Sequence, residues 1–245
     1  MGWLDALLLI GGGLVAGAVN SLAGGGSLLT VPLLVFTGTP GTMANGSNRI
    51  GVLVSNVAAT MEFRRQGIRA LPNLVPILVA SLVGSLIGAA LVSQLDDSSF
   101  EAVFGLLMLP LLVLSLYRPK VGRAREPWSL PVTVAVFFGI GVYAGAFQAG
   151  VGLLLTAALL ASGFDVVRAN AIKVIVILAA TAMVLPVFII SGDVAWAPGL
   201  VLAVGFAAGG TLGAHLTIHR GEVLVRPIMV IAVVASATRL LGLWG

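Results

Sequence analysis

Apolar segments fill almost the whole of this sequence and are separated by short polar loops. Of the 245 residues, 59% are hydrophobic and only 9% are charged. The segments are 5–22, 27–37, 40–62, 71–93, 100–117, 129–149, 153–163, 166–190, 197–218 and 222–241. An α-helix needs roughly 20 apolar residues to cross about 30 Å of hydrocarbon, and several segments reach that length. The sequence therefore predicts an all-α polytopic membrane protein.

Two of the segments, 27–37 and 153–163, are too short to cross a membrane. Each would form about 16 Å of helix, and each follows a glycine-rich break. The breaks are Gly24-Gly25-Gly26 and Gly150-Val151-Gly152. Backbone at membrane depth leaves helical geometry only where protein encloses it or a watery cavity adjoins it. We therefore expect 5–37 and 129–163 to be re-entrant helical hairpins, with close helix packing as the alternative reason for the glycines.

The two halves of the sequence are similar to each other. A shift of 125 residues places Asn45 on Asn170, and one gap aligns the two glycine-rich breaks. Equivalent loops differ in charge: the loop 64–69 contains three Arg, whereas its partner at 191–193 contains an Asp and no cation. Cytoplasmic loops are enriched in Lys and Arg, so equivalent loops are expected on opposite sides of the membrane. The sequence predicts two inverted-topology repeats, each a re-entrant helical hairpin plus three transmembrane helices.

The segment RPKVGRARE, residues 118–126, joins the repeats and carries four cations. We expect it to be a cytoplasmic linker between a first membrane repeat, 1–117, and a second, 127–245, within one integral membrane domain. Both termini are then expected outside. Asp5 lies where a signal peptide would carry Lys or Arg, so the first segment is expected to be retained. The net charge of +4 is assigned to the loops and not to a nucleic-acid partner.

Arg49 and Lys173 are the informative charges inside predicted helices. Arg49 is expected about 13–15 Å along a helix that Thr39 caps and Pro40 starts, and Lys173 about 12 Å beyond Asp165, a predicted N-cap. A cation near the bilayer centre costs about 2.5–3.5 kcal/mol even on the lenient insertion scale. The spans contain no acidic residue at similar depth, so both cations are expected to bind a mobile anion. Snorkelling of their side chains to a lipid headgroup is the alternative.

Polar and glycine residues around the two cations complete the predicted substrate-binding site. Asn side chains on the same helices are expected to orient the anion, and the amide-rich helix starts after the breaks are expected to face it. Asn20 and Gln148, which precede the breaks, would either donate hydrogen bonds to the anion or satisfy hairpin backbone. The predicted site comprises Arg49, Lys173, Asn45, Asn48, Asn170, Asn20, Gln148, Gly24, Gly25, Gly26, Ser27, Gly150 and Gly152.

Several function classes lack the residues that they require. The chain has no Cys, which excludes disulfides and thiolate chemistry. His215 and His219 share a helical face, but no third metal ligand lies nearby in the sequence. A nucleophile elbow, a phosphate-binding loop and paired catalytic carboxylates are also absent from the sequence. We therefore expect neither an enzyme nor a cofactor or metal site.

Three features of the chain point to a known family. A glycine cluster precedes SLLTVPLL at 27–34, Ala-Asn pairs open helices at 44–45 and 169–170, and the pattern recurs in the second half. In these features the sequence resembles the sulfite exporter TauE/SafE family, from about Gly11 to Leu241. The resemblance implies a bacterial membrane protein that exports or permeates small sulfur-containing anions, built from inverted repeats whose first helices form hairpins. The second break, AGVG, departs from the fuller glycine cluster, so two unequal half-sites are expected.

The charge pattern and the resemblance together predict a secondary transporter or permease of the bacterial inner membrane. It would export a small anion, sulfite or an organosulfonate, from a midplane site that the two hairpin tips close alternately. An inside-negative potential favours the exit of an anion by roughly 2.3 kcal/mol per charge per 100 mV, so no coupling ion is obligatory. A passive anion channel and a non-transporting membrane subunit are the alternatives, and the sequence leaves open whether the chain forms a homodimer.

Overall fold

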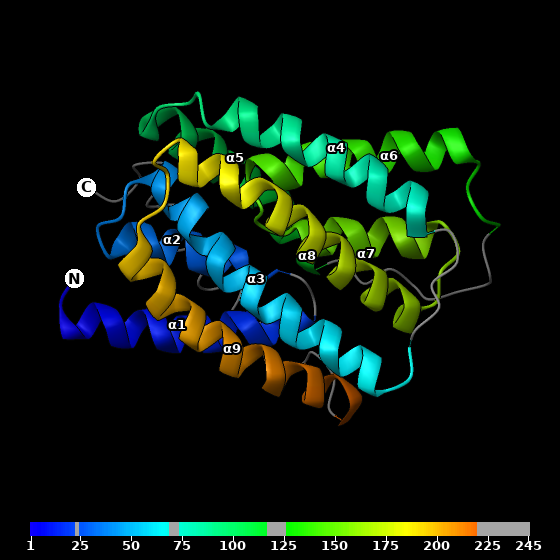
Figure 1. Ribbon diagram of the computed structural model, residues 1–245, viewed down its shortest axis with the longest axis horizontal. Coiled ribbons are helices and arrows are strands. Elements are labelled where there is room, and N and C mark those ends of the chain that lie inside the picture. Colours follow the sequence, from blue (N-terminus) through cyan, green and yellow to red (C-terminus); the bar gives the residue numbers. More distant parts are fainter. Residues whose placement is uncertain (23–24, 69–73, 117–125, 220–245) are drawn as a thin grey trace.

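The described part of the chain is almost entirely helical. The computed structural model describes residues 1–22, 25–68, 74–116 and 126–219, and no strand occurs among them, which confirms the predicted all-α class. The helices are α1 Trp3–Leu22, α2 Ser27–Phe36, α3 Gly41–Arg65, α4 Leu74–Val92, α5 Asp97–Leu116, α6 Leu130–Ala146, α7 Val151–Ala161, α8 Val166–Ile190 and α9 Trp196–His219 (Figure 1). Three predicted features lie wholly or mostly outside the described residues: the last apolar segment 222–241, the linker 118–126 and Gly24.

Three of the described helices, α1, α4 and α8, are long and apolar enough to cross a membrane by length and composition. Helices α2, α6 and α7 and the first part of α9 are apolar but shorter. Large apolar side chains such as Trp3, Val75 and Leu106 are exposed, whereas polar side chains such as Asn45 and Arg49 are buried. An apolar surface around an interior that holds the buried polar groups is the arrangement that a lipid environment favours.

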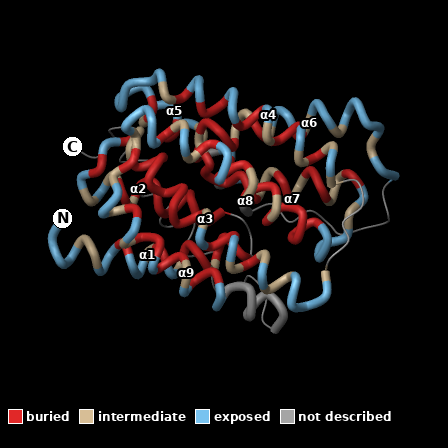
Figure 2. The backbone as a smooth tube through the Cα atoms, in the orientation of Figure 1, coloured by how far each residue is buried: buried red, intermediate tan, exposed pale blue. Residues whose placement is uncertain are grey.

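Helices α3 and α8 occupy the centre of the molecule. On one side α1 packs against α9, and on the opposite side α4 packs against α6 (Figure 1). α3 lies next to α9, α8 lies next to α4, and α3 and α8 contact each other. Buried residues accordingly concentrate on α2, α3, α7 and α8 (Figure 2). Each outer pair therefore joins a helix from the N-terminal half of the chain to one from the C-terminal half.

Glycines let the two outer pairs approach closely. A Cβ atom added at Gly17 of α1 would lie 2.7 Å from the carbonyl oxygen of Phe206 in α9. A Cβ atom added at Gly88 of α4 would overlap the carbonyl oxygen of Val142 in α6. Backbones at such distances require residues without side chains, as is common between membrane helices. These glycines therefore serve helix packing.

Short helices follow both glycine-rich breaks, as the sequence predicts. α2 begins at Ser27 and has 10 residues, and α7 begins at Val151 and has 11 residues. α7 thus starts two residues earlier than expected. The chain leaves helical geometry slightly earlier than predicted: Gln148 and Gly150 have φ angles of +59° and +68°, in the left-handed region, whereas Val151 and Gly152 already belong to α7. A helix cannot continue through such residues, so α6 ends and the chain turns into α7, which contacts α6.

The two central helices start differently. The predicted N-cap of α8 is confirmed, because the carboxylate of Asp165 accepts a hydrogen bond from the amide of Arg168 at 2.9 Å. The predicted cap of α3 by Thr39 is wrong, since Pro40 occupies that position and makes no side-chain cap. Instead Asp97, at the start of α5, accepts from the Thr42 amide at 2.9 Å. The cap comes from a distant segment and leaves no local trace in the sequence.

Candidate functional site

Arg49 lies inside α3 and is completely buried. Its Nη1 donates to the carbonyl oxygen of Ala144 at 3.2 Å and to Oε1 of Gln148 at 2.8 Å. Its Nη2 donates to the carbonyl oxygens of Gly145 and Ala146. The guanidinium group therefore binds the last turn of α6 and the break that follows it.

The end of α6 explains how a buried cation is tolerated at this point. The last carbonyls of a helix have no partner within the helix and together carry about half a negative elementary charge. Asn45, one turn before Arg49, adds a hydrogen bond from its Nδ2 to the carbonyl oxygen of Ala146 at 2.7 Å. The ring of Phe188 lies 4.2 Å from the guanidinium carbon, within cation–π range. Together these groups partly offset the cost of burying the charge.

No carboxylate among the described residues pairs with Arg49. The two ion pairs found in the described part, Glu62 with Arg65 and Asp165 with Arg168, lie at helix ends. Arg49 also has an exposed fraction of 0%, so its side chain does not reach a headgroup. Its neutralising partners are dipoles rather than full charges.

Lys173 of α8 is the second fully buried cation. Its Nζ donates to Oδ1 of Asn170 at 2.8 Å. Side chains three residues apart on a helix face each other, so this hydrogen bond is local to α8. Lys173 likewise does not snorkel to the surface.

Several buried side-chain atoms close to Arg49 in the sequence have no hydrogen-bond partner within the described residues. They include two donors on successive residues of α3, Nδ2 of Asn48 and Nε of Arg49, and one acceptor, Oδ1 of Asn45. The other amide atom of Asn48, Oδ1, accepts from Oγ1 of Thr30 in α2 at 2.5 Å. An unsatisfied buried donor costs about 1–3 kcal/mol, and native structures seldom retain one without a water or a ligand.

The described site residues of the first break are all buried. The carbonyl oxygens of Gly25 and Gly26 accept hydrogen bonds from the amides of Leu28 and Leu29, both at 3.0 Å. These two amides of the first turn of α2 are therefore not available to a ligand. A Cβ atom added at Gly26 would overlap the carbonyl oxygen of Ala16, so this glycine also lets the break pack against α1. The buried residues are Asn20, Gly25, Gly26 and Ser27.

The second break has the same general character. Gly150 and Gly152 are buried, and the carbonyl oxygen of Gly150 accepts from the amide of Leu153 at 2.9 Å. Gln148 joins the break to α8, because its Nε2 donates to Oγ1 of Thr181 at 3.2 Å. Gln148 thus connects Arg49 of α3 with Thr181 of α8.

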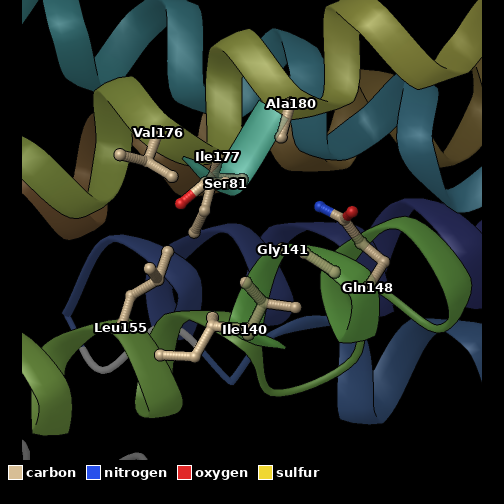
Figure 3. Close-up of a pocket in the computed structure, with 10 residues that line it drawn as sticks. Ser81, Ile140, Gly141, Gln148, Leu155, Val176, Ile177 and Ala180 are labelled. Atoms are coloured by element: carbon tan, nitrogen blue, oxygen red, sulfur yellow. The ribbon is translucent and has the colours of Figure 1, made fainter. Parts of the chain in front are cut away.

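A cavity of about 10 Å³ lies beside the second break, between α4, α6, α7 and α8. The amide of Gln148 points into it, and Ile140, Leu155 and Val176 give it an apolar wall (Figure 3). This volume corresponds to about one water molecule. In the form described here the cavity is too small for an oxyanion of several atoms.

Comparison with known proteins gives the family of the chain. Residues 9–240 match the sequence model of the family described as sulfite exporter TauE/SafE. The chain belongs to this family. The resemblance inferred from the glycine-rich breaks and the repeated Ala-Asn pairs is therefore confirmed.

Relatives of this TauE/SafE protein are named as membrane transporters. It is 30% identical over 223 residues to a probable membrane transporter protein of Haemophilus influenzae, covering 89% of this chain and 88% of the relative. It is 29% identical over 232 residues to the probable membrane transporter protein YfcA of Escherichia coli K12, covering 93% and 86%. It is 26% identical over 234 residues to the probable membrane transporter protein ORF9 of a Sinorhizobium species, covering 93% and 89%. No solved structure shows significant similarity to the chain.

The TauE/SafE chain thus brings some predicted residues together and adds others. Arg49, Asn45 and Gln148 meet at the second break, whereas Lys173 bonds to Asn170 along α8. Sequence reasoning missed three side chains and the carbonyl groups at the end of α6. For Thr30 the sequence does give a signal, since the repeat alignment places it on Thr156. An aromatic ring and backbone carbonyl groups give no such signal. The missed side chains are Thr30, Thr181 and Phe188.

Proposed function

We propose that this TauE/SafE protein is a secondary transporter that exports a small anion, sulfite or an organosulfonate, by alternating access. The site would lie near the membrane midplane, between the tips of two hairpins, α1–α2 and α6–α7. Discontinuous helices in matching positions of two halves are a common location for transporter sites. The relatives are named probable membrane transporter proteins, which favours transport over a purely structural role.

The observation that carries the proposal is the buried guanidinium of Arg49. Its described partners are carbonyl and amide oxygens, so a positive charge remains only partly compensated in a region of low dielectric. The unsatisfied donors Nε of Arg49 and Nδ2 of Asn48 are suited to oxyanion acceptors. Sulfite and sulfonates present several such acceptor oxygens on one negative group. Lys173 and Asn170 of α8 would supply the second, unequal half-site.

The architecture that we propose is a pair of inverted repeats, 1–117 and 127–245, joined by the cytoplasmic linker 118–126, with both termini outside. Two features of the fold support it. α2 and α7 are too short to span a membrane, and each follows a break that reaches the buried centre. In the repeat alignment α1 corresponds to α6 and α9 corresponds to α4. The outer pairs α1–α9 and α4–α6 are therefore equivalent contacts between the two halves. The protein would reside in the bacterial inner membrane.

Flux of candidate anions into proteoliposomes tests the proposal directly. Sulfite, thiosulfate, sulfoacetate, taurine and simple carboxylates would be compared on purified protein. Arg49→Ala and Lys173→Ala should abolish flux of the transported anion without changing the elution of the protein on size exclusion. Arg65→Ala is the matched control, because the Arg65 side chain is 78% exposed and pairs with Glu62 at a helix end. It should leave flux unchanged.

Arg49 also holds the end of α6, so a measurement of binding must accompany flux. A bound anion stabilises the folded protein by RT ln(1 + c/Kd), where c is the free anion concentration, so the thermal midpoint of unfolding rises as c exceeds Kd. This rise should be present in the wild type and in Arg65→Ala and absent in the other two variants. Normal flux in both Arg49→Ala and Lys173→Ala would refute the site. Turnover far above about 10³ per second would indicate a channel, because alternating access requires motions on the μs–ms scale.

A further inference from the structure

A groove of about 680 Å³ lies between the C-terminal end of α3, the start of α4 and one face of α8. Phe63, Ile68 and Leu74 line one side of it, and Ala171 and Ile175 line the other. It is far larger than the cavity at the second break and is large enough for a small anion with its hydration water. The groove is thus an opening between the two central helices at one end of the pair.

The repeat alignment relates this groove to a second place in the fold. A shift of 125 residues places one side of the groove on the end of α8 and the segment that leads into α9, and the other side on α3. In this register Phe63, Ile68 and Leu74 correspond to Phe188, Asp193 and Gly199, and Ala171 and Ile175 correspond to Gly46 and Ile50.

At that second place the corresponding residues are in tight contact. A Cβ atom added at Gly46 would overlap the carbonyl oxygen of Asp193. One added at Gly199 would lie 3.0 Å from the end of the Ile50 side chain. Oγ of Ser47 accepts a hydrogen bond from the amide of Ala195 at 2.8 Å. The same pair of surfaces is therefore open at one end of the α3–α8 pair and closed at the other.

We infer that the groove is the cytoplasmic access path of the transporter and that the contact of Gly46, Ser47 and Ile50 with the segment 188–199 is its closed outer gate. The structure is then an inward-facing state. The outward-facing state would exchange the two arrangements, closing Ile68 onto Ala171 while Asp193 leaves Gly46. This inference rests on the proposed function and on the predicted topology, in which the Arg-rich end of α3 is cytoplasmic.

The charges at the two ends fit the export of an anion. Exposed Arg64 borders the groove and would attract an anion from the cytoplasmic side. At the closed end burial raises the pKa of the Asp193 carboxyl, and the nearby negative charge of Asp97 raises it further. An anion released at that end would meet negative charge, which slows its return.

Single-cysteine labelling tests the inference, because the chain has no Cys of its own. Ile175→Cys lies in the groove, and its repeat partner Ile50→Cys lies in the closed contact and is the matched variant. A water-soluble, membrane-impermeant maleimide should label Ile175→Cys from the cytoplasmic face of inverted vesicles at least about tenfold faster than Ile50→Cys from the outer face, as expected when one state dominates. Equal rates, or labelling of Ile175→Cys only by a membrane-permeant reagent, would overturn the inference.

A wedge at the closed contact adds a second, directional test. Gly46→Ala places a methyl group against the carbonyl of Asp193 and should shift the population toward the outward-facing state. Labelling of Ile50→Cys from outside should then rise and labelling of Ile175→Cys should fall. Gly139→Ala, where an added Cβ meets nothing within 4 Å, is the control and should change neither rate. A Gly46→Ala protein that folds and labels like the control refutes the proposed gate.

The labelling test and the transport test can refute their two proposals independently. Labelling requires no substrate, so the predicted pattern in a protein that moves no anion upholds the access path and refutes the transport proposal. Normal flux with equal labelling at Ile175→Cys and Ile50→Cys refutes the access path alone.

Discussion

Replacement of Gln148 by Ala removes the side chain that joins the second break to both central helices. Two hydrogen bonds are lost: a charge-assisted one from Arg49 at 2.8 Å and a neutral one to Thr181 at 3.2 Å. The first is worth about 1.5–3 kcal/mol and the second about 0.5–1.5 kcal/mol. Since Arg49 keeps its carbonyl partners, we expect Gln148→Ala to lower the free energy of unfolding by about 2–4 kcal/mol.

The backbone at this position supplies an internal comparison. Gln148 has a φ angle of +59°, which costs a residue with a Cβ atom about 1 kcal/mol more than it costs glycine. Gln148→Gly loses the same two hydrogen bonds as Gln148→Ala but relieves this strain. The expected order of stability is therefore wild type, then Gln148→Gly, then Gln148→Ala, with about 1 kcal/mol between the two variants.

Thermal unfolding of the purified protein in one detergent, followed by fluorescence-detected size exclusion, measures this order. Gln94→Ala is the control, because Gln94 is exposed just after the end of α4 and its side chain donates to a local carbonyl oxygen, that of Ala90. Its free energy of unfolding should change by no more than about 0.5 kcal/mol, the usual range for surface substitutions. The reasoning fails if Gln148→Ala unfolds at the wild-type temperature, or if it is more stable than Gln148→Gly.

Two further predictions concern charge. Asn48→Asp places a carboxylate in the buried region of Arg49, so the fold should persist while the affinity for the anion falls at least about tenfold. The affinity is obtained from the shift of the thermal midpoint with anion concentration, and an unchanged affinity would exclude this region from the site. Burial raises the pKa of the Asp193 carboxyl, so its contribution to stability is present below its ordinary value of 3.8 and is lost as pH rises through the raised pKa. Asp193→Asn should therefore lose less thermal stability than the wild type between about pH 4 and pH 7, and parallel pH profiles would contradict this assignment.

Local patterns in the sequence predicted most of the helices. Segment 27–37 corresponds to α2 at Ser27–Phe36, and Asp165 caps α8 as expected, because such features depend on neighbours in the chain. The cap of α3 was missed, since Asp97 reaches it from a helix start far along the sequence. Side-chain type alone gives no sign of such a contact.

The candidate site was predicted in its residue types but not in its contacts. Asn45, Arg49 and Gln148 stand out in the sequence because they are polar groups in apolar surroundings or beside a break. Their common partner is the carbonyl end of α6, a set of backbone atoms that every residue possesses. The sequence therefore shows that a buried cation is unusual, but it does not show that the carbonyl groups at the end of another helix bind it.

The pairing of α1 with α9 has a consequence for the synthesis of the protein. Oγ of Ser21 bonds to the carbonyl oxygen of Gly210, 189 residues later. At about 5–20 residues per second, roughly 10–40 s of translation separate the emergence of these two partners from the ribosome. Until α9 has been synthesised, the glycine-lined face of α1 lacks its partner helix and is covered only by lipid or by the insertion machinery. A polypeptide released early would leave that face uncovered, and membrane proteases would have a simple feature by which to distinguish truncated chains from finished ones.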